Sequence, residues 1–320
     1  MKFDKIIIWG HKLHSHTHSY IHQAFYLAFK HLGYNLLWLN DNDDISDIEF
    51  KNCLFLTEHQ VCENIPIRFD CKYILHNSFV DPGKTYYKSN AGTWKDQKFK
   101  PLAEKGNVIN IQVYKTKFVK NKTKLEDYVY YDLKTYTLYF PWATDLLPHQ
   151  INEIKIHVTK NNSTTEYLVG TIIDEWQPFR IACLKNKINF IHMGGYTGLR
   201  KVSIKENIKL IQQSYIAPAI QRKSQCEEGY IPCRIFKNIS YGKMGFTNSP
   251  VIYELFNEKI IYNPSTTKLF HDAKFWIENQ YNIKHIHELM DFVRDKHTYL
   301  NRINNLFTFF RIIARIIPSE

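Results

Sequence analysis

Short apolar runs alternate with amphipathic stretches along much of the chain. In the first half, residues 20–32 repeat their apolar positions with the period of a helix that ends at Gly33. Apolar runs of strand length stand at residues 6–9, 35–39, 53–56, 73–75 and 108–113. Because strands that alternate with helices build parallel sheets, this pattern predicts a doubly wound α/β domain over residues 1–150.

The alternation restarts after a polar stretch that includes NNSTTE at residues 161–166. Strands are predicted at residues 167–172, 189–193 and 215–220, and helices at residues 178–186, 204–213 and 232–241. This restart predicts a second doubly wound domain over residues 151–290. Helical periodicity then continues over residues 283–317, so the last segment, residues 291–320, is predicted as a long C-terminal helix.

The charge balance favours an anionic ligand. The 320 residues carry 42 Lys and Arg against 31 Asp and Glu, a formal net charge of +11. Their basic residues are scattered and no nucleic-acid motif is present, so no nucleic-acid partner is expected. The six cysteines lack a C-x-x-C pair and are read as reduced thiols. Since the first apolar run is too short for a signal segment, we expect a cytoplasmic protein.

The most informative stretch is EEGYIPCRIFKNISYGKMGFTN, residues 227–248. Pro232 suits a first helical turn, and Arg234, Lys237, Asn238 and Tyr241 then share one helix face. A helix at the carboxyl ends of parallel strands offers its N–H groups and early cations to a diphosphate. The alternative is a surface helix with two ordinary cations.

These residues resemble a known family. RIFKNISYGKMGFTNS, residues 234–249, resembles the "R-[VI]-F-E-A-L-A-C-G" block of the CgeB-like glycosyltransferases. The likeness continues in VIYELF, residues 251–256, and in HTYLNRI, residues 297–303, which is similar to the family's closing "H-[TS]-Y-x-x-R". Upstream, YLVGTI at residues 167–172 and FPWATD at residues 140–145 are similar to the family's first C-terminal strand and its "P-x-A-x-D" element.

The resemblance implies a GT-B type α/β fold, in which two Rossmann-like domains face a cleft and the C-terminal domain binds a nucleotide-sugar donor. Gly170, Arg234 and Asn248 match donor-side positions, with Glu254 a further candidate. Tyr230, Lys237, Asn238 and Ser249, from the same segment, complete the predicted donor set. Lys237 stands where the family usually has an acidic residue that holds the donor ribose, so the resemblance does not fix the nucleotide.

A histidine-rich stretch, GHKLHSHTHSYIH at residues 10–22, follows the first predicted strand. One interpretation is that His16, or else His14 or His18, is the general base that accepts the acceptor's hydroxyl proton. A second is a metal site of His14, His16 and His18 in a metal-dependent hydrolase. A third is a polar loop without chemistry. Asp41 and Asp43 form a D-x-D spacing that keeps a metal-using enzyme among the alternatives.

Other strand-end residues are predicted to contact the acceptor. They are His11, Glu58, His76 and Trp142, the last because an aromatic face packs on the apolar face of a pyranose. A buried core tryptophan is the competing interpretation of Trp142. The C-terminal run over residues 306–318 places Arg311 and Arg315 among apolar residues, and it is expected to pack on the N-terminal domain or, alternatively, to lie peripherally on an anionic membrane face.

Together these observations predict a Leloir-type glycosyltransferase that moves a hexose or related sugar from a nucleotide-diphosphate-sugar donor to a hydroxyl of a glycan, protein or other acceptor. Arg234 and Lys237 would neutralise the diphosphate, so no obligatory metal or other cofactor is expected. The alternative is the metal-dependent hydrolase.

Overall fold

The computed structural model divides the chain into two compact units. Unit 1 comprises Met1–Phe140 with Leu300–Glu320, and unit 2 comprises Pro141–Tyr299. The structure describes residues 2–12, 18–58, 61–76, 91–115, 122–194 and 202–316, without the side chains of residues 91–97. The chain passes between units after residues 140 and 299, whereas the hydrophobic pattern predicts the changes of domain after residues 150 and 290.

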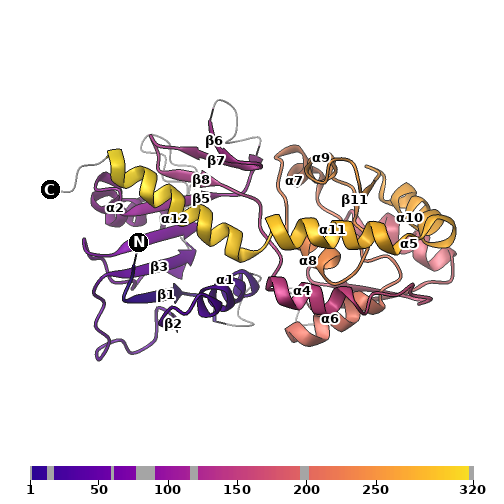
Figure 1. Ribbon diagram of the computed structural model, residues 1–320, viewed down its shortest axis with the longest axis horizontal. Helices are drawn as coiled ribbons and strands as arrows, with labels where there is room; N and C mark the ends of the chain where they lie inside the picture. Colours follow the sequence, from indigo (N-terminus) through magenta and orange to yellow (C-terminus); the bar gives the residue numbers. More distant parts are fainter. Residues whose placement is uncertain are drawn as a thin grey trace. The chain divides into compact units, whose positions relative to one another are not determined.

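Unit 1 is built on an eight-stranded sheet of order β2-β1-β3-β4-β5-β8-β7-β6 (Figure 1). The first six strands in this order are parallel, and β7 and β6 continue the sheet as antiparallel strands. Their bounds are Lys5–Trp9 (β1), Leu36–Leu39 (β2), Cys53–Glu58 (β3), Lys72–His76 (β4), Val108–Gln112 (β5), Thr123–Glu126 (β6), Val129–Asp132 (β7) and Thr137–Tyr139 (β8). Strands β1 and β3 are continuous apolar runs because helices and loops cover both faces of a parallel sheet.

The strand order reverses at β1, which pairs with β2 on one side and with β3 on the other. In an open α/β sheet such a reversal leaves a crevice at the carboxyl ends of the two strands, because the following connections run to opposite faces. Trp9 ends β1 and Glu58 ends β3. The fold therefore places His11, His18 and Glu58 at the position where sheets of this type bind ligands.

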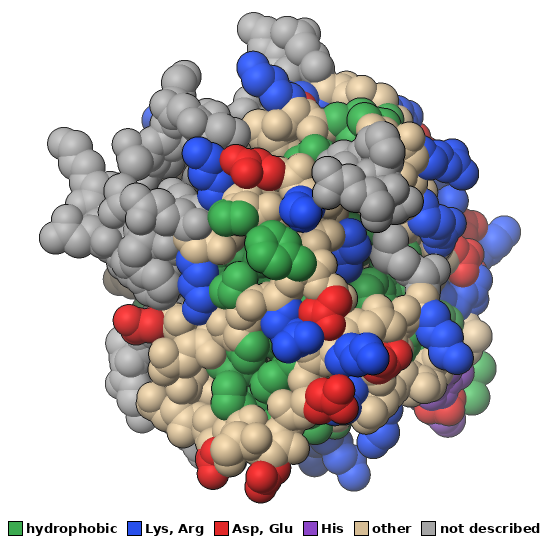
Figure 2. Space-filling view, turned by 90° about the vertical axis from the view of Figure 1, so that its left-hand side faces the viewer, with side chains coloured by type: hydrophobic (Ala, Val, Ile, Leu, Met, Phe, Trp, Pro, Cys, Tyr) green, Lys and Arg blue, Asp and Glu red, His purple; other side chains and the backbone are tan. Residues whose placement is uncertain are grey.

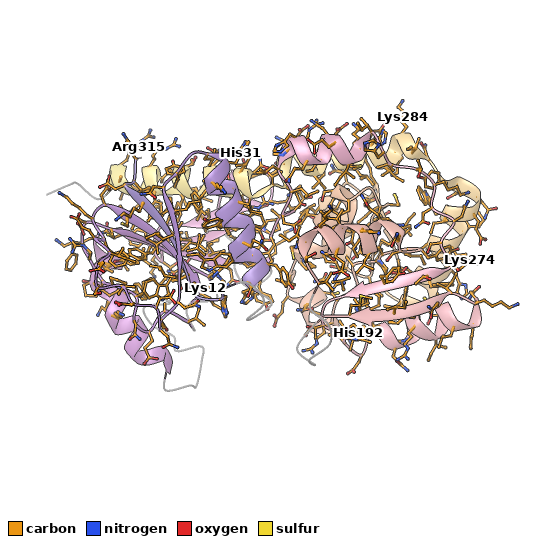
Figure 3. The ribbon with its side chains drawn as sticks, turned by 90° about the horizontal axis from the view of Figure 1, so that it is seen from below. Lys12, His31, His192, Lys274, Lys284 and Arg315 are labelled. Atoms are coloured by element: carbon orange, nitrogen blue, oxygen red, sulfur yellow. The ribbon has the colours of Figure 1, made fainter. Side chains whose placement is uncertain are left out.

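Helices α1 (Ser19–His31), α2 (Ala91–Glu104) and α12 (Tyr299–Ile316) accompany this sheet. Helix α12 runs beside the strands of unit 1 (Figure 1). Its Phe307 ring lies 6.0 Å from that of Phe3 and 6.3 Å from that of Phe29. Arg315 is exposed and points away from the sheet (Figure 3). Apolar residues of α12 thus pack against other residues of unit 1.

Among the helices that the structure describes, none is both long and apolar enough to cross a membrane. The face drawn in Figure 2 carries Lys and Arg side chains interspersed with Asp and Glu, and no patch of a single sign dominates it. Such mixing on this face agrees with the scattered basic residues of the sequence.

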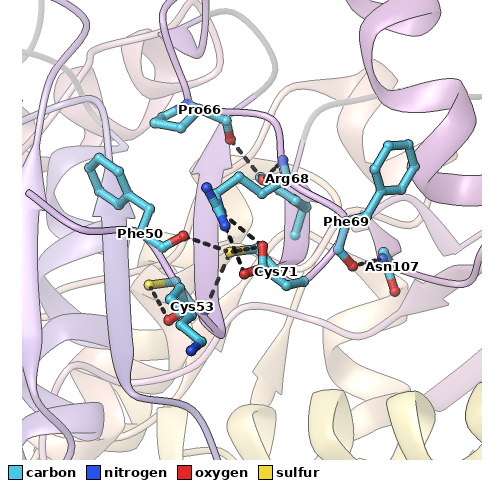
Figure 4. A network of polar contacts seen from close by, with 10 residues as sticks. Phe50, Cys53, Pro66, Arg68, Phe69, Cys71 and Asn107 are labelled. Atoms are coloured by element: carbon cyan, nitrogen blue, oxygen red, sulfur yellow. Dashed lines mark hydrogen bonds and ion pairs between the residues drawn. The ribbon is translucent and has the colours of Figure 1, made fainter.

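A polar network around two thiols lies at the amino-terminal ends of β3 and β4 (Figure 4). The Cys53 amide donates to the Cys71 sulfur at 3.4 Å, and the Cys71 thiol donates to the Phe50 carbonyl at 3.7 Å. Burial raises the pKa of Cys71 to about 12. Since the thiolate is the reactive species, we expect this buried cysteine to react slowly in the folded protein.

We therefore expect a thiol reagent at pH 8 to modify at most two cysteines rapidly. All six are free, but Cys53, Cys62, Cys71 and Cys183 are buried, whereas Cys226 and Cys233 are partly exposed. Titration with a chromogenic disulfide should count the two accessible thiols before, and all six after, unfolding in guanidinium chloride. Rapid modification of four or more in the folded protein would contradict this assignment.

Unit 2 contains two short parallel strand pairs. Strands β9 (Thr165–Val169) and β10 (Asn189–Met193) form one, and β11 (Phe246–Thr247) and β12 (Ile261–Tyr262) form the other. Its helices are α4 (Pro148–Lys155), α5 (Trp176–Lys185), α6 (Ile204–Gln213), α7 (Lys223–Glu227), α8 (Cys233–Ser240), α9 (Pro250–Leu255), α10 (Thr266–Phe275), the π-helix η2 (Trp276–Gln280) and α11 (Ile283–Lys296).

One predicted strand of unit 2 is wrong in detail. The strand predicted over residues 215–220 is reduced to a single bridge between Ala219 and Thr247. Ala217 has a φ of 59°, which breaks the extended conformation. The helical periodicity predicted over residues 283–317 corresponds to two helices, α11 and α12, which are separated where His297 leaves the helical conformation and Thr298 bridges to Thr144.

Candidate functional site

Helix α8 is amphipathic and anchors the predicted donor segment in unit 2. Ile235, Phe236 and Ile239 are buried, so the helix is held by one apolar face. Pro232 is its N-cap residue, in an extended conformation that starts the helix. This arrangement leaves Arg234 and Lys237 on the other side of the helix, where both are only partly buried.

Arg234 lies directly against Gly170, the residue that follows β9. A Cβ atom at Gly170 would stand 2.6 Å from Nη2 of Arg234, and Gly170 has a φ of +131°. The guanidinium also lies over the Trp176 ring, 5.9 Å from its centroid. Two donor residues predicted from separate stretches of sequence are therefore neighbours, and the absence of a side chain at Gly170 leaves room for the guanidinium.

Among the described residues, Arg234 is not part of an ion pair. No carboxylate of the described residues lies within ion-pair distance of its guanidinium. Burial lowers the pKa of Arg234, and the more distant Glu166 carboxyl opposes this shift. An arginine stays charged in proteins. A partly buried guanidinium of this kind is suited to bind an anion with two oxygens side by side.

Lys237, in contrast, is already paired. Its Nζ lies 2.8 Å from Asp145 Oδ2, and the two side chains are 12% and 3% exposed. Tyr241 donates its hydroxyl to Asp145 at 2.7 Å. Burial, and then Asp145, raise the pKa of Tyr241 well above its ordinary value. Asp145 thus joins the FPWATD stretch to the C-terminal half of α8.

Replacing Lys237 by Met is expected to destabilise the protein by about 1–3 kcal/mol, because the buried Asp145 carboxylate then loses its ammonium partner. The free energy of unfolding in urea measures this change. Lys209→Met is the matched control, since Lys209 is an exposed lysine of α6. Equal unfolding midpoints for the Lys237 variant and the wild type would exclude a structural role for this pair.

Asn238 and Asn248 make backbone hydrogen bonds. Asn238 donates to the Ala217 carbonyl at 2.6 Å, and Asn248 both accepts from the Gln221 amide at 2.8 Å and donates to the Gln221 carbonyl at 2.9 Å. Both are buried, so they hold the loop over residues 217–221 in place. A buried Ser249 precedes α9, Tyr230 is half-buried, and Glu254 is exposed on α9.

The stretches that carry the family resemblance meet in unit 2. Thr144 and Ser240 share a hydrogen bond of 2.7 Å between their hydroxyls. The Thr144 amide donates to the His297 carbonyl at 3.0 Å, and the His297 ring stacks on Phe236 with 4.7 Å between centroids. Thr144, Ser240 and His297, from three stretches that are far apart in the sequence, therefore belong to one packed structure around α8 in unit 2.

A second group of polar side chains lies in unit 1 at the carboxyl ends of β1 and β3. His11 Nε2 contacts Oε2 of Glu58, and His18 Nδ1 lies 2.9 Å from the same oxygen. His11 follows β1, His18 is the N-cap residue of α1, and Glu58 ends β3. Burial raises the pKa of Glu58, but the contacts with His11 and His18 outweigh this effect and hold that pKa below its usual range.

Two buried histidines lie beside this group. His22 and His76 are joined by a hydrogen bond of 2.7 Å between their Nε2 atoms, and His22 Nδ1 lies 2.9 Å from the Gly10 carbonyl. Burial lowers the pKa of His22 to about 3 and that of His76 well below its ordinary value. Both imidazoles are therefore neutral at physiological pH. The sequence predicts His76 as an acceptor contact, and the structure places its ring beside His18 and His22.

The remaining predicted residues have different positions. His14 and His16 lie outside the described residues. Trp142 is 1% exposed, so its ring is a core residue and offers no open face to a sugar. The D-x-D carboxylates have structural partners: Asp41 accepts from the Trp9 indole at 2.7 Å, and Asp43 pairs with Lys12.

Sequence reasoning missed the polar residues under the donor segment. Glu166, fully buried on β9, accepts from the Ile216 amide at 2.7 Å and from the Ala217 amide at 2.9 Å. Burial raises the pKa of Glu166 and lowers that of Lys243, while the attraction between the two charges opposes both shifts. No short motif marks these residues. Asp145, the partner of Lys237, does stand in a stretch that the sequence marks, FPWATD.

A pocket of about 380 Å³ also opens in unit 2. Its walls include His157, Lys160, Tyr241 and Trp276, but neither Gly170 nor Arg234. The pocket is therefore separate from the arginine that the sequence marks for donor binding. Because chemistry rather than volume identifies a phosphate site, we place the donor candidate at Arg234.

No family model matches the sequence, and no curated protein matches it either. Among solved structures, the chain is similar to an alpha-glucosyltransferase in complex with UDP, with a TM-score of 0.55, 8% sequence identity, and coverage of 96% of this chain and 99% of the other. It is also similar to an alpha1,3-fucosyltransferase, with a TM-score of 0.42, 12% identity, and coverage of 97% and 90%. The chain therefore has a mixed α/β fold of the GT-B type.

Proposed function

We propose that this protein is a glycosyltransferase that uses a nucleotide-diphosphate sugar, as the CgeB-like motifs imply. The observation that carries the proposal is the contact of Arg234 with Gly170 at the end of β9. Among the described residues no carboxylate pairs with this guanidinium. A side chain at residue 170 would occupy the space that the guanidinium uses. The GT-B type fold agrees with it, since the similar alpha-glucosyltransferase was solved with UDP.

In the proposed reaction, the bond between the sugar's anomeric carbon and the diphosphate oxygen breaks, and a bond from the acceptor oxygen to that carbon forms. Arg234 stabilises the negative charge that develops on the leaving diphosphate. The acceptor's hydroxyl proton passes to a histidine of the stretch after β1, for which His16 is the first candidate and His14 the second. No metal ion is required at the diphosphate, because the arginine and backbone N–H groups carry that role.

Ligand binding tests this function directly. We expect one class among UDP-, GDP-, CMP- and dTDP-sugars to raise the melting temperature, because a ligand that binds only the folded state stabilises it by RT ln(1 + [L]/Kd). At a ligand concentration about a hundred times Kd, the gain is about 2.7 kcal/mol. The free nucleoside diphosphate should give most of the shift, whereas the nucleoside should give little. A panel without any shift at millimolar concentration would refute the proposal.

A further inference from the structure

His11, His18 and Glu58 lie close enough together to share one ligand. The atoms His11 Nε2, His18 Nδ1 and Glu58 Oε2 all fall within 4.8 Å of one another and belong to unit 1, whereas Arg234 belongs to unit 2. Two imidazole nitrogens and one carboxylate are the donor set of open zinc sites, in which a fourth position takes water or a substrate oxygen. We propose that these residues bind a divalent transition-metal ion of the zinc class.

The three ligands reach this point from three separate elements at the reversal of strand order. His11 comes from the end of β1, His18 from the start of α1 and Glu58 from the end of β3. This is where open α/β sheets bind their ligands. Two imidazoles meet on one oxygen of Glu58, a residue about forty positions further along the chain, and a hydrophobic core alone gives no reason to assemble such a group.

The backbone at His11 is strained in a way that serves this geometry. His11 has a φ of 52°, which is a left-handed conformation. This conformation is unfavourable in free energy for a residue that carries a side chain. The preceding Gly10 has a φ of +83°, and a Cβ there would stand 2.3 Å from a methyl carbon of Val61. The chain therefore turns sharply after β1, and this turn directs the His11 imidazole towards Glu58.

A second layer of histidines fixes the proposed ligands. His22 lies behind His11, with 5.5 Å between ring centroids, and His76 lies 5.2 Å from His18. His22 Nδ1 also contacts the Gly10 carbonyl, which holds the strained turn. Groups that orient metal ligands from behind contribute to metal affinity, because they fix the ring positions before the ion binds.

Charge and ligand type favour a transition-metal ion over calcium or magnesium. The Glu58 side chain is 2% exposed, and a carboxylate so deeply buried needs a positive charge beside it. Imidazole nitrogens suit zinc and its neighbours in the first transition row, whereas calcium and magnesium prefer oxygen ligands. Two nitrogens and a single carboxylate therefore fit Zn²⁺.

Titration with Co²⁺ and Zn²⁺ tests the site without any assay of sugar transfer. After dialysis against a chelator, we expect the full chain to bind one equivalent of Co²⁺ with the visible absorption of a four-coordinate ion, and Zn²⁺ to displace it. Glu58→Gln and His18→Ala should each weaken Zn²⁺ binding by at least about a hundredfold, since even residues behind metal ligands contribute about 10–100-fold. Calorimetry gives the affinities.

His31→Ala is the matched control, because His31 is an exposed histidine of α1 in the same unit, seen in Figure 3, and should leave binding unchanged. Circular dichroism of each variant separates lost binding from lost folding, and His18→Gln provides a second variant of similar size. Arg234→Ala should bind Co²⁺ normally, so failure of the metal site and failure of the donor site are distinguishable. Absence of stoichiometric binding to the wild type, or equal affinity in folded Glu58 and His18 variants, would overturn the proposal.

Discussion

Replacing Arg234 by Ala is expected to lower kcat for sugar transfer by at least about a hundredfold. The size follows from the loss of one positioned charge-stabilising donor, which costs about 10²–10³ in rate. Arg234 is the described cation best suited to this role, because it is partly buried, packs over Trp176 and has no carboxylate at ion-pair distance among the described residues. The diphosphate develops charge as its bond to the sugar breaks, so the loss should appear in kcat more than in KM.

The variants around this arginine separate charge from geometry. Arg234→Lys keeps a positive charge but loses the two-pronged contact, and we expect it to recover only part of the rate. Gly170→Ala keeps the arginine but places a Cβ 2.6 Å from Nη2, so it should impair donor binding by displacing the guanidinium. Arg180→Ala is the control, because Arg180 is an exposed arginine of the same unit that also lies over an aromatic ring. A near-normal rate for Arg234→Ala would remove the basis of the proposed function.

Replacing Glu166 by Leu is expected to destabilise the protein by about 3–5 kcal/mol, the usual cost of removing one partner from a buried charged pair. The change leaves the Ile216 and Ala217 amides without their acceptor and leaves Lys243 buried without a countercharge. Urea unfolding measures the loss. Glu153→Leu is the control, since Glu153 is exposed on α4.

A double-mutant cycle on Glu166 and Lys243 measures how much of this destabilisation comes from the attraction between their charges. Lys243→Met alone should destabilise less than Glu166→Leu, because the carboxylate keeps its two amide donors. Combining the two should recover part of the loss, with a coupling of about 0.5–3 kcal/mol for residues in one network. Strictly additive effects would show that Glu166 acts through the amides alone.

The same carboxyl predicts a pH dependence of stability. Burial raises the pKa of Glu166 from 4.5 to about 7, so the folded state binds more protons than the unfolded state between these values. The contribution of Glu166 to stability is therefore present below pH 4.5 and is lost as the pH rises to about 7. Relative to Glu166→Gln, the wild type should lose stability between pH 5 and pH 7.5, by at most about 1.4 kcal/mol per pH unit. An equal pH dependence of the unfolding free energy in the wild type and in Glu166→Gln would contradict the raised pKa of Glu166.

Much of unit 1 could be predicted from the sequence, because its strands are short continuous apolar runs and α1 has a clear helical period. These signals are local, because they depend only on which of the neighbouring side chains are apolar and become buried. Unit 2 was predicted less well. Its Ile216 and Ala217 look like a strand, but their amides bind the Glu166 carboxylate, a contact between residues about fifty positions apart. Periodicity carries no information about such a contact.

The sequence by itself determined the α/β class, the helix that carries Arg234 and the histidine-rich stretch after the first strand, because each depends on neighbouring residues. Only the tertiary structure decided which of these residues meet. It brought Gly170 against Arg234, paired Lys237 with Asp145, and gathered His11 and His18 around Glu58. The reason is physical: strand order and loop conformation set which side chains share a site, and both are settled by packing across the whole unit rather than by local preference.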